Sequence, residues 1–343
     1  RNPAQNAREN KADMLFVVNT STDQEFNGLA SQLAHFLSGG SLTLAKPGEG
    51  DDANEGVFFI KPSTAGKIFN TTIADLKSAK KDLSNVGTTE ITYNLEMNVK
   101  EVHTENVLGY MEGSDPELKN ELVILTAHYD HVGMDGDEIY NGADDDASGT
   151  STILEIAEAF AEAKKAGKGP RRSILFMPVT AEEKGLLGSA YYAENPIFPL
   201  EKTVANLNID MIGRVDPKHK GNPNYVYLVG TDRLSTELHE ISEHVNSTYT
   251  NLELDYTYND EGHPDRIYYR SDHWNFAKND IPIIFYFNGV HEDYHKPTDT
   301  IEKINFDILT KRAHLVFYTA WALANRDERP EVDKLKDQKL DTN

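Results

Sequence analysis

The pattern of apolar and polar positions divides the chain at about residue 89. From there to about residue 325, short continuous runs of β-branched and large apolar residues alternate with stretches in which apolar residues recur every three or four positions. Continuous runs are typical of strands buried on both faces of a sheet, and the second spacing is typical of helices that cover such a sheet. We therefore predict an α/β fold with a covered central sheet, and we assign its strands to residues 121–128, 172–180, 203–212, 224–230 and 281–289.

Two stretches in this region show the helical spacing most clearly. In residues 148–167, apolar side chains share one face and glycines end the stretch. Residues 306–326 form the last predicted helix. The residues expected to face the sheet are Ile153, Ile156, Ala157 and Phe160 in the first stretch, and Ile308, Leu309, Ala313, Val316 and Phe317 in the second.

Residues 1–88 are interpreted as a separate, smaller α/β module. We predict that residues 89–325 form a larger domain, since a chain of 343 residues is long enough for both. Residues 326–343 are rich in charge and are expected to contribute little to the fold. Within the small module, the apolar segments lie at residues 12–20 and 55–62 and a helical stretch lies at residues 64–83.

Composition restricts the chemistry and the partners. With 38% hydrophobic and 26% charged residues, the chain resembles a soluble globular protein, and no apolar run approaches the roughly 20 residues that cross a bilayer. A formal net charge of -22 disfavours nucleic acid and anionic lipid as partners, and it favours cations and substrates with a free ammonium group. Because the sequence contains no cysteine, disulfides, thiolate zinc sites and cysteine nucleophiles are excluded.

Polar side chains gather directly after the predicted strands. In an open α/β sheet, sites form beyond the carboxyl ends of the strands. Carboxylates and imidazoles in combination favour zinc or a similar divalent metal. A helix that starts after the aspartate run would also stabilise those acids, by a few tenths to about 1 kcal/mol. The residues concerned are His128, Asp130, His131, Asp144, Asp145, Asp146, Glu182, Glu183, Asp210, His291, Tyr294 and His295.

Each of these signals also has a purely structural alternative. A histidine at a strand end is usually a hydrogen-bonded surface or core residue. An aspartate run is usually a solvated loop or a helix cap, and Asp146 or Ser148 could serve only as a cap. Asp210, between Ile209 and Met211, is harder to explain without a partner, because an unpaired buried carboxylate is costly. The coincidence at successive strand ends favours a metal site, in which at least one of the adjacent aspartates holds metal between two ions.

Six motifs within residues 127–301 resemble, in the same order, those of the zinc aminopeptidase family that includes bacterial leucyl aminopeptidases and aminopeptidase Y. Carboxypeptidase Q, glutamate carboxypeptidase and glutaminyl cyclase are relatives of this family. The resemblance implies a three-layer sandwich with a mixed, mostly parallel central sheet, and residues 1–88 resemble part of a protease-associated domain. The motifs are "AHYDHVG", "NGADDDASG", "AEEKGLLGS", "NIDMIGR", "RSDHWNF" and "YHKPTDT".

The resemblance implies a ligand set for two zinc ions. His128, Asp145 and Asp210 would hold one ion. Glu183 and His295 would hold the other, and Asp145 would bridge both. The family usually has asparagine directly after the bridging aspartate, so the third aspartate of the run is a departure that adds negative charge.

The resemblance also implies catalytic and supporting roles. Glu182 would be the general base, and Tyr294 could hydrogen-bond the developing oxyanion. Asp130 would accept a hydrogen bond from the first histidine ligand and fix its tautomer. Arg270 would contact substrate and Asp272 would support the site.

These roles predict a co-catalytic two-zinc exopeptidase, with cobalt or manganese as alternative metals. An aminopeptidase is favoured, because carboxylates near the metals would anchor a free N-terminal ammonium. The alternatives are a carboxypeptidase or dipeptidase of the carboxypeptidase Q type, a single-zinc glutaminyl cyclase, and an inactive binding ectodomain. Residues 283–287, "IIFYF", are interpreted as core strand and not as a substrate pocket. The protease-associated module and the first residue, Arg1, lead us to expect a removed signal or a longer product, and export from the cytoplasm.

Overall fold

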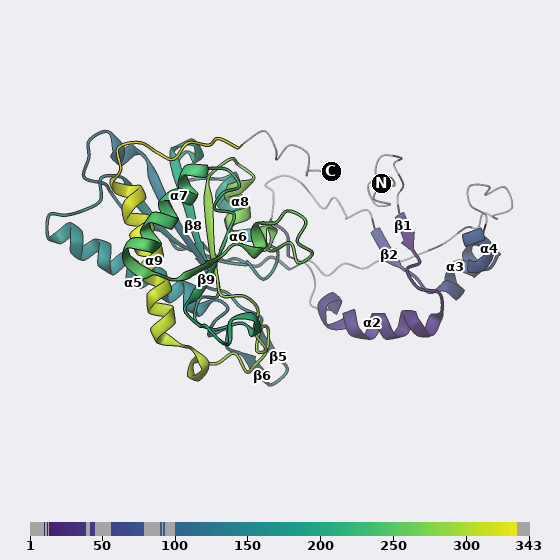
Figure 1. The fold of residues 1–343 in the computed structure, drawn as a ribbon. Helices are drawn as coiled ribbons and strands as arrows, with labels where there is room; N and C mark the ends of the chain where they lie inside the picture. Colours follow the sequence, from purple (N-terminus) through teal and green to yellow (C-terminus); the bar gives the residue numbers. More distant parts are fainter. Residues whose placement is uncertain are drawn as a thin grey trace. The chain divides into compact units, whose positions relative to one another are not determined.

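The computed structural model describes residues 14–38, 42–44, 56–78 and 100–334, and the single positions 10, 12, 90 and 92. The chain divides into two compact units, residues 1–102 and 103–343 (Figure 1). Close to the start of the second unit, the N–H of Val107 donates a hydrogen bond to the carbonyl of Pro178 in the central sheet. The boundary at residue 88 stays a prediction. Within the described part of the chain, no helix combines the length and the apolar character needed to cross a bilayer.

The first unit contains a pair of parallel strands followed by two short helices. Both apolar runs that we predicted there form strands. The predicted helical stretch is two helices, because Asn70 adopts a left-handed conformation and ends the first of them. A longer helix between the strands was not predicted. The assignment of residues 1–88 to a protease-associated module stays a prediction. The elements are β1 (Met14–Val17), α2 (Asp23–Ser38), β2 (Gly56–Phe59), α3 (Pro62–Phe69) and α4 (Ile73–Ser78).

A seven-stranded sheet forms the centre of the second unit, in the order β10-β9-β11-β8-β4-β7-β3. Four neighbouring pairs are parallel, while β3 is antiparallel to β7 and β11 is antiparallel to β9. The five predicted strands and the mixed, mostly parallel sheet are therefore confirmed; the two short edge strands were not predicted. The bounds are β3 (Gly109–Met111), β4 (Leu122–His128), β7 (Ser173–Val179), β8 (Thr203–Ile209), β9 (Tyr225–Val229), β10 (Glu253–Asp255) and β11 (Ile283–Phe287).

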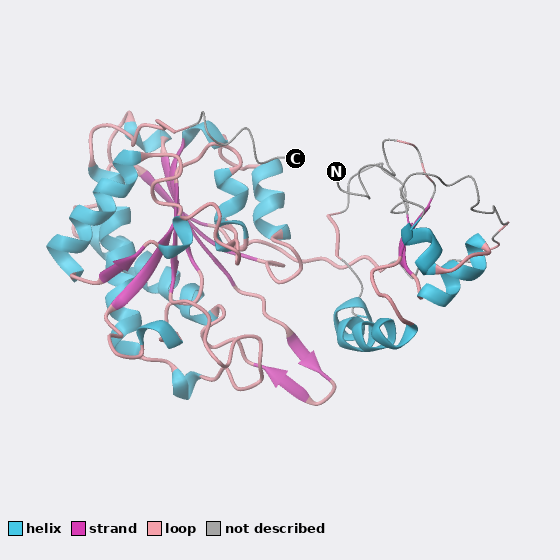
Figure 2. Ribbon diagram, turned by 45° about the vertical axis from the view of Figure 1, so that its right-hand side comes forward, coloured by secondary structure: helices cyan, strands magenta, loops and turns pink. Residues whose placement is uncertain are grey.

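Helices cover both faces of this sheet, as Figures 1 and 2 show. Alternate residues of the strands point to opposite faces, so that Val123 and Leu125 pack in one core and Leu122 and Ile124 in another. Helices α5, α7 and α9 bury their apolar residues in the first core, and α6 and α8 bury theirs in the second. The bounds are α5 (Ala147–Lys165), α6 (Leu187–Glu194), α7 (Thr236–Val245), α8 (His273–Ala277) and α9 (Phe306–Asn325).

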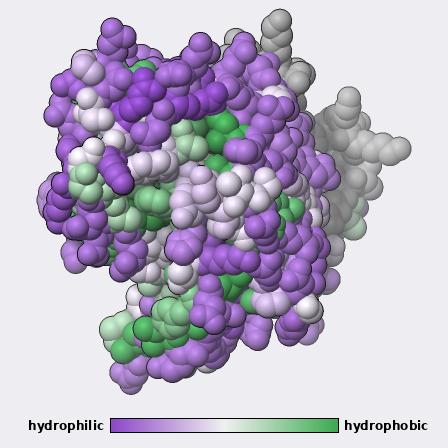
Figure 3. All heavy atoms as spheres, turned by 60° about the vertical axis from the view of Figure 1, so that its left-hand side comes forward, coloured by the Kyte–Doolittle hydropathy of each residue, from purple (hydrophilic) through white to green (hydrophobic). Residues whose placement is uncertain are grey.

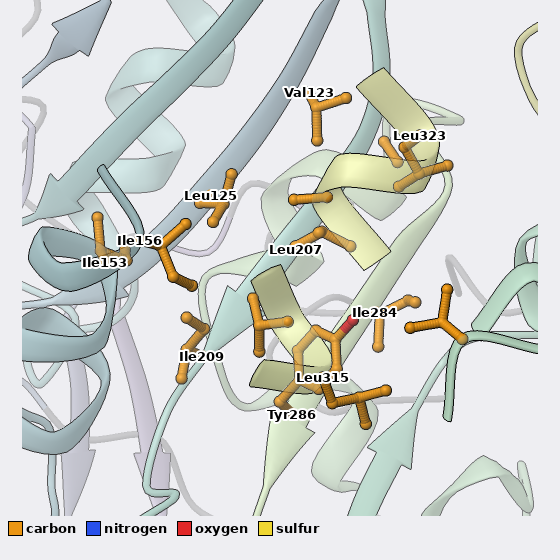
Figure 4. Packing of buried hydrophobic residues seen from close by; sticks show 14 of the residues in the cluster. Val123, Leu125, Ile153, Ile156, Leu207, Ile209, Ile284, Tyr286, Leu315 and Leu323 are labelled. Carbon is orange, nitrogen blue, oxygen red and sulfur yellow. The ribbon is translucent and has the colours of Figure 1, made fainter. Parts of the chain in front are cut away.

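The inward face of α9 differs in part from the predicted one. Leu315 and Leu323 are fully buried against the sheet, where Figure 4 shows them among the side chains of β4, β8 and β11. Arg312 is buried as well, because its guanidinium donates hydrogen bonds to the carbonyl groups of Ile212, Arg214 and Tyr225. A charged residue can therefore occupy the face that apolar spacing assigns to the core, provided that its donors are satisfied.

Residues 326–334 contribute more to the fold than we expected from their charge. Arg329 donates hydrogen bonds to the carbonyls of Glu201 and Thr203, and the N–H of Asp333 donates to the carbonyl of Leu234. The segment is held because its charged side chains and backbone pair with backbone groups at the ends of other elements. Residues 335–343 lie outside the described residues.

A small antiparallel hairpin, β5 (Gly133–Asp135) and β6 (Glu138–Tyr140), projects from the second unit between two of the motif segments (Figures 1 and 2). In the view of Figure 3, hydrophilic residues cover most of the surface and apolar patches are small.

Candidate active site

Asp146, the third of the three adjacent aspartates, binds backbone groups. Its Oδ1 accepts hydrogen bonds from the N–H groups of Gly149 and Met211, at 2.9 and 3.1 Å, and its Oδ2 accepts one from the N–H of His128 at 3.2 Å. The bond from Gly149 caps the N-terminus of α5, so the alternative interpretation of Asp146 as a helix cap is confirmed. One buried carboxyl thus joins the end of β4, the start of α5 and the segment after β8.

A first group of metal-ligand donors surrounds one oxygen of Asp145. The Nε2 atom of His128 lies 3.1 Å from Oδ1 of Asp145 and 3.7 Å from Oδ1 of Asp210. All three residues are buried. Burial alone lowers the pKa of His128, but the two carboxylates outweigh it and raise that pKa well above its ordinary value. The other oxygen of Asp210 accepts a hydrogen bond of 2.7 Å from the hydroxyl of Ser271, which orients the carboxylate.

A second group surrounds the other oxygen of Asp145. Its Oδ2 lies 3.1 Å from Nε2 of His295, and that nitrogen lies 3.3 Å from Oε2 of Glu183. Burial alone lowers the pKa of His295, but Asp145 and Glu183 outweigh it and raise the pKa to about 9. Burial alone raises the pKa of Glu183, but His131 and His295 outweigh it and lower the pKa to about 2. Charges of opposite sign therefore compensate one another within this group.

The polar atoms of the second group fit a cation better than they fit one another. Oδ2 of Asp145, Oε1 of Glu183 and both ring nitrogens of His131 are buried, yet they have no hydrogen-bond partner among the described residues. Buried polar atoms without a partner are costly, and a divalent ion would satisfy them. Imidazole nitrogens and carboxylate oxygens are a donor set that zinc prefers. All five predicted ligands thus come together, and their binding of metal stays a prediction.

Asp130 supports the site in a different way from the one predicted. The Nδ1 atom of His128 is 2.9 Å from the backbone carbonyl oxygen of Asp130, and that bond fixes the ring with Nε2 toward the first group. The carboxylate accepts hydrogen bonds from the N–H groups of Glu182 and Glu183, at 3.1 and 3.3 Å. Ala181 has a φ of 53°, which turns the chain after β7 and presents both N–H groups to the Asp130 carboxylate. Because the carboxylate binds these groups, it does not accept a hydrogen bond from the ring of His128.

Asp299 holds the backbone of Asp144 and Asp145, and Asp144 pairs with His291; sequence reasoning gave Asp299, Asp144 and His291 no such role. One oxygen of Asp299 accepts hydrogen bonds from the N–H groups of Asp144 and Asp145, at 2.9 and 3.2 Å. The carboxylate of Asp144 accepts a bond from the N–H of Gly213, and it lies 3.1 Å from Nε2 of His291. All of these side chains are buried. The one feature of the sequence that could have pointed to Asp299 is its position in the "YHKPTDT" motif.

Arg214 connects the segment after β8, which carries Asp210, to the loop that carries His295. Its guanidinium donates a hydrogen bond of 2.8 Å to Asp293 and lies 3.7 Å from Asp299. Asp293 also accepts a bond of 2.6 Å from Lys303. Burial alone raises the pKa of Asp293, but these cations and Thr298 outweigh it and hold the pKa far below its ordinary value. A charged network therefore helps to fix the loop that presents His295.

A small pocket with a volume of about 40 Å³, partly open to solvent, adjoins both groups. One side of it is polar and carries the predicted base and the predicted oxyanion donor. The other side is apolar and includes two residues of β11, which we predicted to be core strand only; they are buried in the core and also line the pocket. The polar residues are Asp145, Glu182, Asp210, Arg270, Tyr294 and His295, and the apolar ones are Met211, Ile267, Phe285, Phe287 and Val290.

The pKa values of two side chains on the polar side bear on their predicted roles. Burial raises the pKa of Glu182 well above its ordinary value, with nearby carboxylates adding to the effect, so its carboxyl group can hold a proton. Burial also raises the pKa of Tyr294, which keeps its hydroxyl as a donor. The Tyr294 ring stacks on His295, with centroids 3.9 Å apart. Arg270 is exposed on the pocket wall, where a substrate can reach it.

Asp272, the predicted supporting residue, is fully buried close to the first group. One of its oxygens accepts a hydrogen bond of 2.5 Å from the hydroxyl of Ser189. Burial raises its pKa to about 7. Its support of the ligands stays a prediction.

His273 makes the stability of the protein depend on pH. Its Nε2 donates a hydrogen bond of 2.7 Å to the carbonyl of Tyr268, its ring stacks on Phe285, and full burial lowers its pKa to about 3. An unfolded histidine has a pKa of about 6.5, so below that pH the unfolded chain binds a proton that the folded chain does not. Between pH 6.5 and pH 5 this costs about 2 kcal/mol of the free energy of unfolding.

The variant His273→Phe keeps the stacked ring and loses this titration. We expect the wild type to lose about 2 kcal/mol more than the variant when urea unfolding is measured at pH 7 and again at pH 5. An equal loss in both proteins would show that His273 is protonated in the folded state.

Comparison with known proteins places the chain in a family. The sequence profile of peptidase family M28 matches residues 106–320, which is more than half of the chain. The chain belongs to peptidase family M28. Aminopeptidase YwaD of Bacillus subtilis is 27% identical over 249 residues, which are 67% of this chain and 47% of that protein. Leucine aminopeptidase 1 of Sclerotinia sclerotiorum is 32% identical over 223 residues, 61% of this chain and 54% of that protein.

Solved structures of M28-like enzymes share the fold of the second unit. BSAP, a zinc aminopeptidase from Bacillus subtilis, aligns with a TM-score of 0.52 and 26% identity over 67% of this chain and 52% of its own. The LapA aminopeptidase of Legionella pneumophila aligns with a TM-score of 0.53 and 26% identity over 65% and 55%. The predicted zinc exopeptidase fold is thus confirmed. The chain spans about half the length of the curated relatives that it matches.

Proposed function

We propose that this chain carries the catalytic unit of a two-metal aminopeptidase. One observation carries the proposal: the two oxygens of Asp145 face two separate groups of imidazole and carboxylate donors, and Glu182 lies in the pocket beside them. The first group is His128, Asp145 and Asp210, and the second contains Asp145, Glu183 and His295. Membership of a peptidase family and similarity to zinc aminopeptidases support zinc as the metal.

The chemistry is divided between two adjacent glutamates. Divalent ions bound in both groups would lower the pKa of water towards neutrality and polarise the scissile carbonyl. Glu183 belongs to the ligand set, whereas Glu182 is free to accept the proton of the attacking water and to return it to the leaving amine. Tyr294 donates a hydrogen bond to the carbonyl oxygen as that oxygen gains negative charge.

The pocket suits a peptide with a free N-terminus. Its acidic side offers carboxylates to an ammonium group, and its apolar wall of Met211, Ile267, Phe285 and Phe287 offers contact to an apolar first side chain. Arg270 on the same wall favours the second candidate, a carboxypeptidase or dipeptidase, because a guanidinium pairs well with a substrate carboxylate.

Matched substrates separate these functions. We expect the protein to release p-nitroaniline from leucine p-nitroanilide and to leave the N-acetylated compound intact. Removing metal with a chelator should abolish release, and added zinc should restore it. Cleavage of N-blocked peptides from their C-terminus would support the carboxypeptidase instead. Cyclisation of an N-terminal glutamine, with one metal per chain, would support a glutaminyl cyclase.

We also propose that the partners of this chain are peptide substrates. We propose further that the protein is exported from the cytoplasm. Cell fractionation of a producing organism, followed by immunodetection in each fraction, tests the second proposal.

A further inference from the structure

We propose that His131 is a fourth protein ligand in the second group, so that the second ion is held by four side chains and the first by three. The inference rests on the proposed function, because it concerns the same pair of ions. His131 lies in the "AHYDHVG" motif, three residues after the first histidine ligand, and the resemblance assigns it no role.

The distances between donor atoms fit one tetrahedral ion. With bonds of about 2.0–2.1 Å, the ligand atoms of tetrahedral zinc lie about 3.3–3.4 Å apart. The Nδ1 atom of His131 is 2.9 Å from Oε1 of Glu183 and 3.8 Å from Oδ2 of Asp145. The Nε2 atom of His295 is 3.1 Å from that same Asp145 oxygen and 3.3 Å from the other oxygen of Glu183, Oε2, so that each histidine faces its own oxygen of this carboxylate. These four distances scatter around the tetrahedral value.

The imidazole of His131 lacks the partners that a structural histidine has. Its side chain is 9% exposed, and neither ring nitrogen makes a hydrogen bond within the described part of the chain. Oε1 of Glu183 is 2.9 Å from Nδ1 of His131 without forming a hydrogen bond to it, and it has no hydrogen bond to any described residue. The lack of hydrogen bonds at Nδ1 of His131 and at the neighbouring Oε1 of Glu183 is explained if both atoms bind a common ion.

The backbone holds the His131 ring in this position. Gly142, with a φ of 60°, packs directly on the ring, and a Cβ atom there would come within 2.7 Å of Cγ of His131. On another side, the ring meets the ring of His295 edge to face, with centroids 5.7 Å apart. Glycine is therefore required at position 142 for the imidazole to reach the second group.

With four protein ligands on one ion and three on the other, the two sites should differ in zinc affinity and in access to water. A fourth protein ligand completes the tetrahedral set of the second ion, which could then reach water or substrate only by becoming five-coordinate, whereas a site with three protein ligands keeps a position for water or substrate. The second group, with His131, Asp145, Glu183 and His295, is then the tighter site. The first group, with His128, Asp145 and Asp210, keeps the open position.

A titration of metal-free protein with zinc against a chromophoric chelator tests the assignment. We expect the wild type to bind two ions. In His131→Phe, which keeps a ring and loses the donor, the affinity of one ion should fall by more than the about 10–100-fold that loss of an outer-shell partner causes. The other affinity should not change. His314→Phe, on the exposed side of α9, should match the wild type in both.

The outcomes separate the two proposals. A wild type that binds fewer than two ions contradicts the proposed function and this inference together. A wild type that binds two ions, with both affinities unchanged in His131→Phe, overturns this inference alone. Should the variant fail to fold, X-ray absorption of the zinc-loaded wild type decides: three imidazoles for every two ions support His131 as a ligand, and two imidazoles exclude it.

Discussion

Replacing Glu182 by glutamine is expected to lower kcat by about 10²–10⁴-fold while both metal ions stay bound. Glutamine keeps the size of the side chain but cannot accept the proton of the attacking water. Both metal groups should survive, because the side chain of Glu182 belongs to neither, and its N–H still donates to Asp130. The measurement is the hydrolysis rate of leucine p-nitroanilide at saturating substrate, together with the metal content of the same sample.

The exposed Glu194 at the end of α6 provides the control, since Glu194→Gln removes the same charge outside the site. We expect it to retain the wild-type rate. Turnover of Glu182→Gln close to that of the wild type would remove Glu182 from the role of general base. Loss of metal in this variant would instead make it a ligand.

Replacing Asp145 by asparagine is expected to have the largest effect, because this one side chain belongs to both of the proposed metal groups. Its two oxygens lie 3.1 Å from His128 and 3.1 Å from His295 respectively. An amide offers one oxygen and no negative charge, so it cannot bridge two cations. Both zinc affinities should fall, and hydrolysis should drop at least as far as in Glu182→Gln. Zinc per chain, measured after dialysis against metal-free buffer, checks the first expectation.

Asp137→Asn, in the exposed turn of the β5–β6 hairpin, removes an equal charge and should leave the metal content unchanged. Two tightly bound ions in Asp145→Asn would show that the two groups are held independently of this residue, and the bridging role would be lost.

The strands and the position of the site could be predicted because both follow from local patterns. Continuous apolar runs gave the five inner strands, and each of those runs is buried along most of its length. The edge strands β3 and β10 have three residues each, which is too few to show a period. The place where the predicted ligands meet could be anticipated because they follow strands whose carboxyl ends share one edge of the sheet.

The residues that hold the ligands could not be predicted, because their partners are distant in sequence. Asp299 reaches back to the N–H groups of Asp144 and Asp145, more than 150 residues earlier. The buried position of Arg312 likewise depends on carbonyl groups of other elements. His131 stood in a quoted motif, but its direction toward the second group depends on the packing of Gly142.

The most direct test of the account is an anomalous-scattering map recorded on both sides of the zinc edge, from crystals grown with zinc. We predict two peaks, one on each side of the Asp145 carboxylate and about 3.5–4 Å apart. One peak should lie against His128 and Asp210, and the other against Glu183 and His295. No peak at this carboxylate, or a single peak on one side of it, would contradict the account.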